Sequence, residues 1–324
     1  MSTPHAAAPT DDRAGRPDGP HVMTTASPKV AIILGIVTLL LAAVVAFGSQ
    51  TGDTTFRLST RRDLAQLPDV TVPANATAWV AIVLMALATA EAVRRYLART
   101  KVPLWLPAAY GVVAMIGFLA WAAAGATLPV IGLLAGALAL AVPLVFGALG
   151  GVLGERVGVV NIAIDGQLLA GAFAAALVGS LVGSAWAGLI GAMLAGALVG
   201  LVLGVFAISY FVDQVIVGVV LNVLIIGLTS FMFSQVLAPN AATLNSPPRL
   251  GPVSVPLLGE IPVIGPILFR QSVVVYLLYV AVAVVTWSLY RTRWGLRVRA
   301  VGEHPQAADT VGINVLRTRY RTLL

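Results

Sequence analysis

Long apolar segments alternate with short polar ones along most of the chain. A helix of about 20 apolar residues crosses the roughly 30 Å of hydrocarbon in a bilayer. The pattern therefore predicts an all-α fold, a polytopic transmembrane helix bundle of about eight spans. The predicted spans are Val30–Phe47, Ala78–Val93, Pro103–Ala124, Pro129–Leu153, Leu168–Val182, Trp186–Ser209, Val215–Leu237 and Ser272–Tyr290. Leu168–Val182 is short for a full crossing, so its ends are left open.

Three further segments are polar. Residues 1–29 have no apolar period and are predicted to be a disordered cytoplasmic tail. Residues 49–77 and 238–270 are predicted to be loops, the second of them rich in proline and glycine.

Composition agrees with a membrane protein and excludes several kinds of chemistry. The chain is 59% hydrophobic and only 10% charged, whereas soluble domains carry about 25% charged residues. It has no Cys, and none of its three His lies in an apolar segment, which excludes thiol catalysis and argues against a metal centre. No G-x-x-x-x-G-K-[ST] loop and no plausible Ser/His/Asp set occurs. We expect no cofactor and no enzymatic activity.

Basic residues set the expected orientation. Eleven Lys and Arg lie in 94–101 and 291–324, and three more in the N-terminal tail, against five in the loops 49–77 and 238–270. Counting spans alternately puts the tail and both basic segments on the cytoplasmic side, in a bacterial cell membrane in contact with its lipids. The net charge of +7 is explained by these flanks, and no nucleic-acid partner is expected.

The stretch 150–171 places polar residues between uncharged apolar segments. Charges against hydrocarbon are costly, so intramembrane ionisable groups suggest function. Its glycines are expected to weaken a helix, and broken backbone at membrane depth needs protein or water around it. We interpret the stretch as a polar piece of a translocation pathway near the cytoplasmic side. Its candidate lining residues are Asn161, Asp165 and Gln167.

Two features of the following spans have alternative interpretations. Asn222 stands alone in an apolar helix, where it either forms a helix–helix hydrogen bond or lines the pathway. Gly196, Gly200 and Gly204 recur every four residues and indicate a seam for close helix packing.

Residues 300–312 have helix signals within a basic segment. Pro305 suits the first turn of a helix, Gln306–Val311 can continue it, and Gly312 can end it. On the cytoplasmic face such a helix is either a docking element or part of a solvated loop with basic membrane anchors.

Together these stretches resemble a known family, over roughly Pro129–Tyr320. The resemblance is to permease subunits of ATP-binding-cassette importers, in the branch that includes branched-chain amino acid, simple-sugar and nucleoside permeases, and it is greatest to the nucleoside type. The matching stretches are Glu155–Gln167, Asp213–Asn222, the proline-rich loop 252–270 and Arg291–Asn314.

The resemblance implies a subunit that translocates substrate and binds no ATP itself. Its implied partners are cytoplasmic ATPase subunits, a second related permease and an extracytoplasmic substrate-binding lipoprotein. The coupling loop that contacts the ATPase corresponds to Ala300–Gly312, with matching residues Gly302, Glu303, Pro305, Asp309 and Gly312.

The resemblance also implies an organisation for the chain. Residues 30–128 are additional N-terminal spans, 129–290 the permease core, and 291–324 the coupling loop and the start of a C-terminal part. Because the family continues with further spans, the chain is expected to be truncated before them.

Two function hypotheses follow. The first is a permease subunit of an ATP-driven importer that moves nucleosides or simple sugars by alternating access. The alternative is an ion-coupled secondary transporter or channel in which Asp165 or Glu155 couples to the ion. We find no clear inverted repeat of the kind that such transporters often have.

Overall fold

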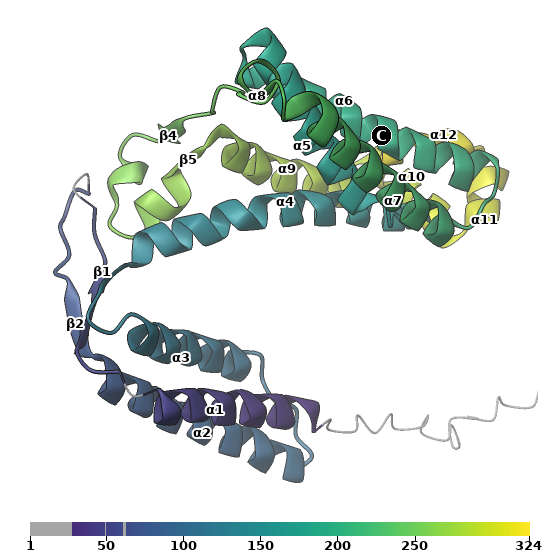
Figure 1. Ribbon diagram of the computed structural model, residues 1–324. Helices are drawn as coiled ribbons and strands as arrows, with labels where there is room; N and C mark the ends of the chain where they lie inside the picture. Colours follow the sequence, from purple (N-terminus) through teal and green to yellow (C-terminus); the bar gives the residue numbers. More distant parts are fainter. Residues whose placement is uncertain (1–27, 49, 61–62) are drawn as a thin grey trace, which may run out of the picture. The chain divides into compact units, whose positions relative to one another are not determined.

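The computed structural model describes residues 28–48, 50–60 and 63–324 (Figure 1). Within these ranges, eight helices are long and apolar enough to cross a membrane, so the predicted helical bundle is confirmed. They are α1 (Lys29–Phe47), α2 (Ala74–Leu97), α3 (Trp105–Ala122), α4 (Val130–Arg156), α5 (Ile164–Val182), α6 (Ala185–Gly204), α7 (Gln214–Met232) and α9 (Val273–Arg291). The predicted tail lies almost entirely outside the described residues.

The helix whose ends the apolar pattern left open, α5, begins at Ile164 and has 19 residues. Both α6 and α7 continue into π-helical turns, Val205–Ser209 and Phe233–Leu237, so these spans reach their predicted ends at Ser209 and Leu237. A π-helical turn is usually a local feature within an α-helix and often accompanies a functional segment.

Short strands lie between the membrane-spanning helices, most of them in the two segments predicted as loops. β1 (Asp53–Arg57) pairs antiparallel with β2 (Val70–Pro73), and β3 (Thr127–Pro129) joins the other edge of β1. In the second loop, β4 (Pro252–Ser254) pairs antiparallel with β5 (Arg270–Ser272). Pairing in these strands provides hydrogen-bond partners for backbone N–H and C=O groups between the membrane-spanning helices.

The described residues form two compact units, one within 28–48, 50–56 and 69–128 and the other within 57–60, 63–68 and 129–324. In the described part of the first unit, α1, α2 and α3 lie side by side (Figure 1) around a core that includes Leu34, Met85 and Leu106. One residue of each helix contributes to a polar cluster inside this core. The Tyr110 hydroxyl lies 2.9 Å from Thr38 Oγ1 and 2.7 Å from the Leu34 carbonyl, and Thr89 Oγ1 lies 3.3 Å from Thr38 Oγ1.

The second unit is built on α4 to α9, with α5 and α6 packed as a hairpin. The hairpin helices approach closely through glycines, because a Cβ on Gly188 would lie 2.7 Å from the Ala175 carbonyl oxygen and 3.2 Å from Gly179 Cα. A short helix, α8 (Ala241–Leu244), follows α7. Small residues are what allow such backbone contact between membrane helices.

A segment from the N-terminal part of the sequence packs onto the loop before α9, and its described residues are 57–60 and 63–68. Asp63, whose side chain is fully buried, lies 3.1 Å from the Arg270 guanidinium, which is 15% exposed. Arg270 also donates to Thr60 Oγ1 at 2.9 Å, and the Leu64 N–H donates to the Glu260 carbonyl at 2.8 Å. We call residues 57–60 and 63–68 the strap.

Three short helices follow α9: α10 (Arg293–Glu303), α11 (Pro305–Thr310) and α12 (Val315–Leu323). They lie at the end of the second unit opposite β4 and β5 (Figure 1). The helix predicted from Pro305 is present, and Gly312 ends it with φ of +83°, a conformation that favours glycine. The predicted start and stop are confirmed.

Candidate functional site

The break between α4 and α5 is narrower than the sequence suggests. We expected glycines to weaken the helix across 150–171, yet α4 continues through Gly150, Gly151 and Gly154 to Arg156. The non-helical part is residues 157–163, which we call the break segment. A glycine costs a helix only about 1 kcal/mol, whereas an unsatisfied backbone group in hydrocarbon costs several. The helix therefore persists.

Glycines shape the start of the break segment. Gly158 has φ of +79°, which reverses the chain, and the Val159 N–H donates to the Gly154 carbonyl at 2.8 Å. A Cβ on Gly154 would lie 2.7 Å from the Val159 carbonyl oxygen. Both positions therefore require glycine: one for its backbone conformation and the other for lack of space.

Two of the predicted polar residues contact each other. Asn161 is buried, and its side-chain oxygen accepts a hydrogen bond from the Ala163 N–H at 3.0 Å. Its amide nitrogen donates to Gln167 Oε1 at 2.9 Å. Asn161 thus fixes the turn into α5 and ties it to a residue one turn inside that helix.

Asn222, from α7, completes the arrangement. Its side-chain oxygen accepts from the Gly166 N–H at 2.7 Å, and its side-chain nitrogen donates to the Ile162 carbonyl at 2.9 Å. The first N–H groups of a helix have no partner within the helix, so α7 provides a cap for α5. The helix–helix hydrogen bond is present; a role in lining a pathway stays a prediction for Asn161, Gln167 and Asn222.

Sequence reasoning missed two residues of α7 that belong to the same junction. The Val160 N–H donates to Gln214 Oε1, and a Cβ on Gly218 would lie 2.6 Å from Ile162 Cβ. Gln214, Gly218 and Asn222 are spaced by four, so they share one helix face. This spacing in the sequence could have predicted that the three residues lie at one contact. We call the side chains of Asn161, Gln167, Gln214 and Asn222 the amide junction.

The charged candidates lie apart from the amide junction. Glu155, Arg156 and Asp165 are all exposed. None of the three forms an ion pair with another residue that the structure describes. The structure thus brings together the neutral polar residues of the stretch 150–171 and leaves its charges on the surface.

The α10–α12 segment lies directly against the break segment. Val157 and Val159 are 0% and 1% exposed, in one apolar cluster with Val298 and Val301 of α10 and with Ala308 of α11. Of the predicted coupling residues, Glu303, Asp309 and Gly312 are exposed and Pro305 is half-buried. Gly302 instead packs against the backbone at the end of α4, because a Cβ there would collide with the Arg156 carbonyl group.

The glycine seam on α6 receives side chains from α5 and α12. A Cβ on Gly200 would lie 2.9 Å from Gln167 Nε2, and one on Gly204 would lie 3.0 Å from Leu323 Cδ2. The Tyr320 hydroxyl donates to the Gly204 carbonyl at 3.2 Å. Close packing at this seam, which the four-residue repeat predicted, is therefore present.

With this geometry in place, comparison with known proteins identifies the family. Residues 133–324, well over half of the chain, match the family described as the branched-chain amino acid transport system / permease component. The chain belongs to this family. The resemblance predicted from the four stretches is thereby confirmed, and eight apolar helices make this permease-family chain a multi-pass membrane protein.

Several relatives of this permease-family chain have names. A guanosine ABC transporter permease protein, NupQ of Bacillus subtilis, is 42% identical over 172 residues, 51% of this chain and 54% of that protein. A nucleoside ABC transporter permease protein, NupC of Lactococcus lactis, is 37% identical over 178 residues, 52% of this chain and 55% of that protein.

A third relative carries a sugar in its name. A putative glucose ABC transporter permease protein, TsgC13 of Haloferax volcanii, is 34% identical over 169 residues, 52% of this chain and 51% of that protein. The chain spans about half the length of the relatives it matches. No solved structure matches it.

Proposed function

We propose that this chain belongs to the translocating subunit of an ATP-driven importer and that its substrates are nucleosides. The observation that carries the proposal is the similarity to two permease proteins named for guanosine and nucleoside transport, at 42% and 37% identity. The relative named for glucose is less similar, at 34%. Simple sugars are therefore the second substrate class to test.

The polar chemistry of the second unit supports a neutral substrate. The amide junction presents uncharged donors and acceptors, while the carboxylates of Asp165 and Asp213 beside it are exposed. Nucleosides and sugars are neutral and rich in hydroxyl groups, which amides can both donate to and accept from. Asn161, Asp165, Gln167 and Asn222 are the residues that we propose to line the pathway.

The mechanism that we propose is alternating access driven from the cytoplasmic face. In the proposed orientation, the N-terminus, the break segment and α10–α12 are on the cytoplasmic side of a bacterial cell membrane, as the distribution of Lys and Arg favours. Glu303 and Asp309 are exposed at the ends of α10 and α11, where they can contact an ATPase subunit. ATP hydrolysis takes place on that separate subunit.

The proposed assembly has three further components, namely a pair of ATPase subunits, a second related permease and an extracytoplasmic substrate-binding lipoprotein. The proposed organisation of the chain is additional N-terminal spans over 30–128, a permease core over 129–290 and the coupling segment over 291–324. A bacterial cell would then take up nucleosides only when all these components are present.

The test is reconstitution of the native permease with its ATPase and binding protein in liposomes. We expect uptake of labelled guanosine or another nucleoside to require ATP, with competition by nucleosides greater than competition by ribose, glucose or leucine. In the same preparation, Glu303→Lys is expected to reduce assembly with the ATPase or substrate-stimulated ATP hydrolysis, because it reverses an exposed charge.

One result would overturn the proposal in favour of the ion-coupled alternative. That result is nucleoside uptake by the purified permease alone, with no ATPase present, driven by an ion gradient and abolished by Asp165→Asn. Uptake that ribose or glucose inhibits more strongly than nucleosides would instead change the substrate class.

A further inference from the structure

The predicted coupling residues do not all occupy one surface, and this difference leads to a new assignment. Glu303 and Asp309 face outward, whereas Gly302 faces the backbone of the break segment. We propose that Gly302 is a positioning residue, and that the break segment carries the movement of α10 and α11 directly to the beginnings of α5 and α7. This inference rests on the function proposed above and specifies the route of coupling inside the chain.

The first step of the route is a backbone contact without space for a side chain. An added Cβ on Gly302 would collide with the carbonyl carbon and oxygen of Arg156 and would lie 3.4 Å from the Gly158 nitrogen. An added Cβ on Gly158 would in turn lie 3.6 Å from Gly302 Cα. Backbone atoms cannot move aside as a flexible side chain can, so α10 and the break segment are in fixed register here.

The second step is an apolar contact that holds the two segments together. Val157 and Val159 alternate with Gly158 along the break segment and are 0% and 1% exposed. They pack in one cluster with Val298 and Val301, which are both 0% exposed. Because closely packed interiors transmit displacement with little compression, movement of α10 displaces the break segment.

The third step joins the break segment to two helices by hydrogen bonds. The Val160 N–H and the Ile162 carbonyl bond to Gln214 and Asn222 of α7. The Asn161 side chain bonds to Gln167 of α5. Residues 157–159 are thus held by α10, and residues 160–162 by α7 and α5. No residue between 156 and 163 is left without one of these attachments.

The variant Gly302→Ala tests the first step, with Gly136→Ala as its matched control. Gly136 lies on α4, outside the stretch 150–171, and a Cβ there would meet nothing within 4 Å. Val157→Ala tests the second step without adding atoms, with Val142→Ala as its control. Val142 is buried on α4 at 6% exposure, in a different apolar cluster with Val275 and Leu278.

The decisive measurement is the number of nucleosides taken up per ATP hydrolysed in the reconstituted importer. We expect Gly302→Ala and Val157→Ala to lower this ratio at least tenfold while assembly with the ATPase and its rate of hydrolysis are kept. A residue with a merely structural role would lower uptake and hydrolysis together. The two controls are expected to keep the ratio of the native protein.

A second measurement does not depend on transport. Amide hydrogen exchange of the native full chain and its variants in nanodiscs reports the opening of residues 159–167. We expect Gly302→Ala and Val157→Ala to speed this exchange about tenfold, equivalent to about 1.4 kcal/mol, and the controls to leave it unchanged.

The outcomes separate the two proposals. If the native importer fails to take up nucleosides with ATP, the proposed function is wrong, and the exchange measurement alone decides whether α10 holds the break segment. If the importer works and both test variants match their controls in ratio and in exchange, the route through Gly302 is wrong. Altered exchange with an unchanged transport ratio also overturns the coupling role.

Discussion

The second unit is held at its two ends by polar contacts of different chemistry. At the end with β4 and β5, the strap is fixed by a charged pair, Asp63 with Arg270, in which the carboxylate side chain is fully buried. At the other end, the amide junction fixes the break segment with neutral side chains that bond mainly to backbone groups. The first contact is an ion pair. The second provides hydrogen-bond partners for backbone groups where the chain is not helical between α4 and α5.

The difference follows from what surrounds each contact. The strap and Arg270 lie in segments between the membrane-spanning helices. The amide junction connects the beginnings of two such helices with neutral amides, which are cheaper to desolvate than charges. Neutral groups can also exchange partners when helices move, whereas breaking a buried ion pair leaves an uncompensated charge.

The largest effect is expected from breaking the charged pair on one side. Arg270→Met leaves Asp63 buried without its cation and also removes the bond to Thr60. Losing one partner of a buried pair costs about 3–5 kcal/mol. The measurement is thermal unfolding in detergent, together with the rate of tryptic cleavage within 57–68. Arg270→Met combined with Asp63→Asn should recover part of the loss; no recovery would show that the charge is not its cause.

A smaller but still large effect is expected at the amide junction. Asn222→Leu leaves the Gly166 N–H and the Ile162 carbonyl without their partner. The part-buried Gly166 N–H accounts for about 1–3 kcal/mol of the loss, and the exposed Ile162 carbonyl, which water can reach, for less. Thermal unfolding of the purified chain measures the loss, and faster amide exchange at Gly166 locates it. Gln167→Leu removes only a side chain–side chain bond and is the matched comparison. If Gln167→Leu were the more damaging variant, the capping role of Asn222 would be wrong.

The third largest loss of stability is expected in the first unit. Tyr110→Phe removes a hydroxyl that contacts Thr38 and the Leu34 carbonyl, but Thr38 keeps its own bond to Leu34 at 2.8 Å. No backbone group of a helix break depends on Tyr110. We expect a loss of about 0.5–1.5 kcal/mol, typical of a single hydrogen bond. Unfolding of Tyr110→Phe beside Asn222→Leu checks the ranking, which fails if the tyrosine variant is the less stable of the two.

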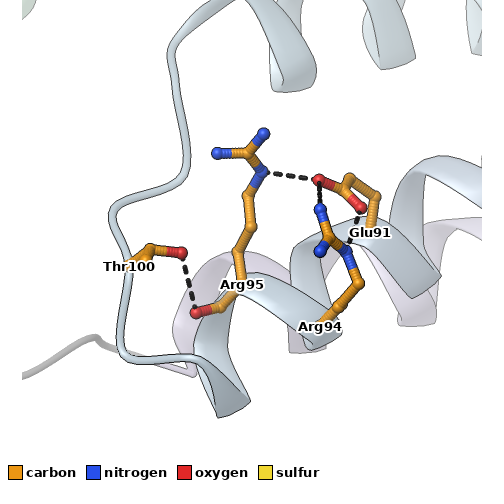
Figure 2. Close-up of polar contacts among 4 residues, drawn as sticks. All are labelled: Glu91, Arg94, Arg95 and Thr100. Atoms are coloured by element: carbon orange, nitrogen blue, oxygen red, sulfur yellow. Dashed lines mark hydrogen bonds and ion pairs between the residues drawn. The ribbon is translucent and has the colours of Figure 1, made fainter.

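The smallest effect is expected from the surface cluster at the end of α2. Figure 2 shows Glu91 bonded to Arg94 and Arg95, both at 2.7 Å, with Thr100 bonded to the Arg95 carbonyl. The Arg94 side chain is 72% exposed, so water and salt screen the pair. Glu91→Gln should leave the unfolding temperature unchanged in 0.5 M salt. A loss as large as that of Arg270→Met would mean that exposure is a poor guide to the strength of these contacts.

Much of this protein follows from its sequence alone, for reasons that are local. The eight apolar segments identify the spans, because hydrocarbon admits only apolar helices of sufficient length. Pro305 begins α11 because its ring fixes φ at a value that suits a helix. Gly312 follows the end of α11 because glycine, which has no Cβ, readily adopts a positive φ. The four matching stretches predicted the family, and the match over residues 133–324 confirms it.

Tertiary structure alone decided how the polar residues are partnered. Asp165 and Gln167 are two positions apart, yet one is exposed and the other bonds to Asn161. Gln214 bonds to Val160, which is 54 residues away in the sequence, and Arg270 bonds to Thr60, which is 210 residues away. Local sequence patterns indicate which segments can cross a membrane and where a helix ends. Which partner satisfies a buried donor, acceptor or charge depends on chain packing, which brings distant segments within hydrogen-bonding distance.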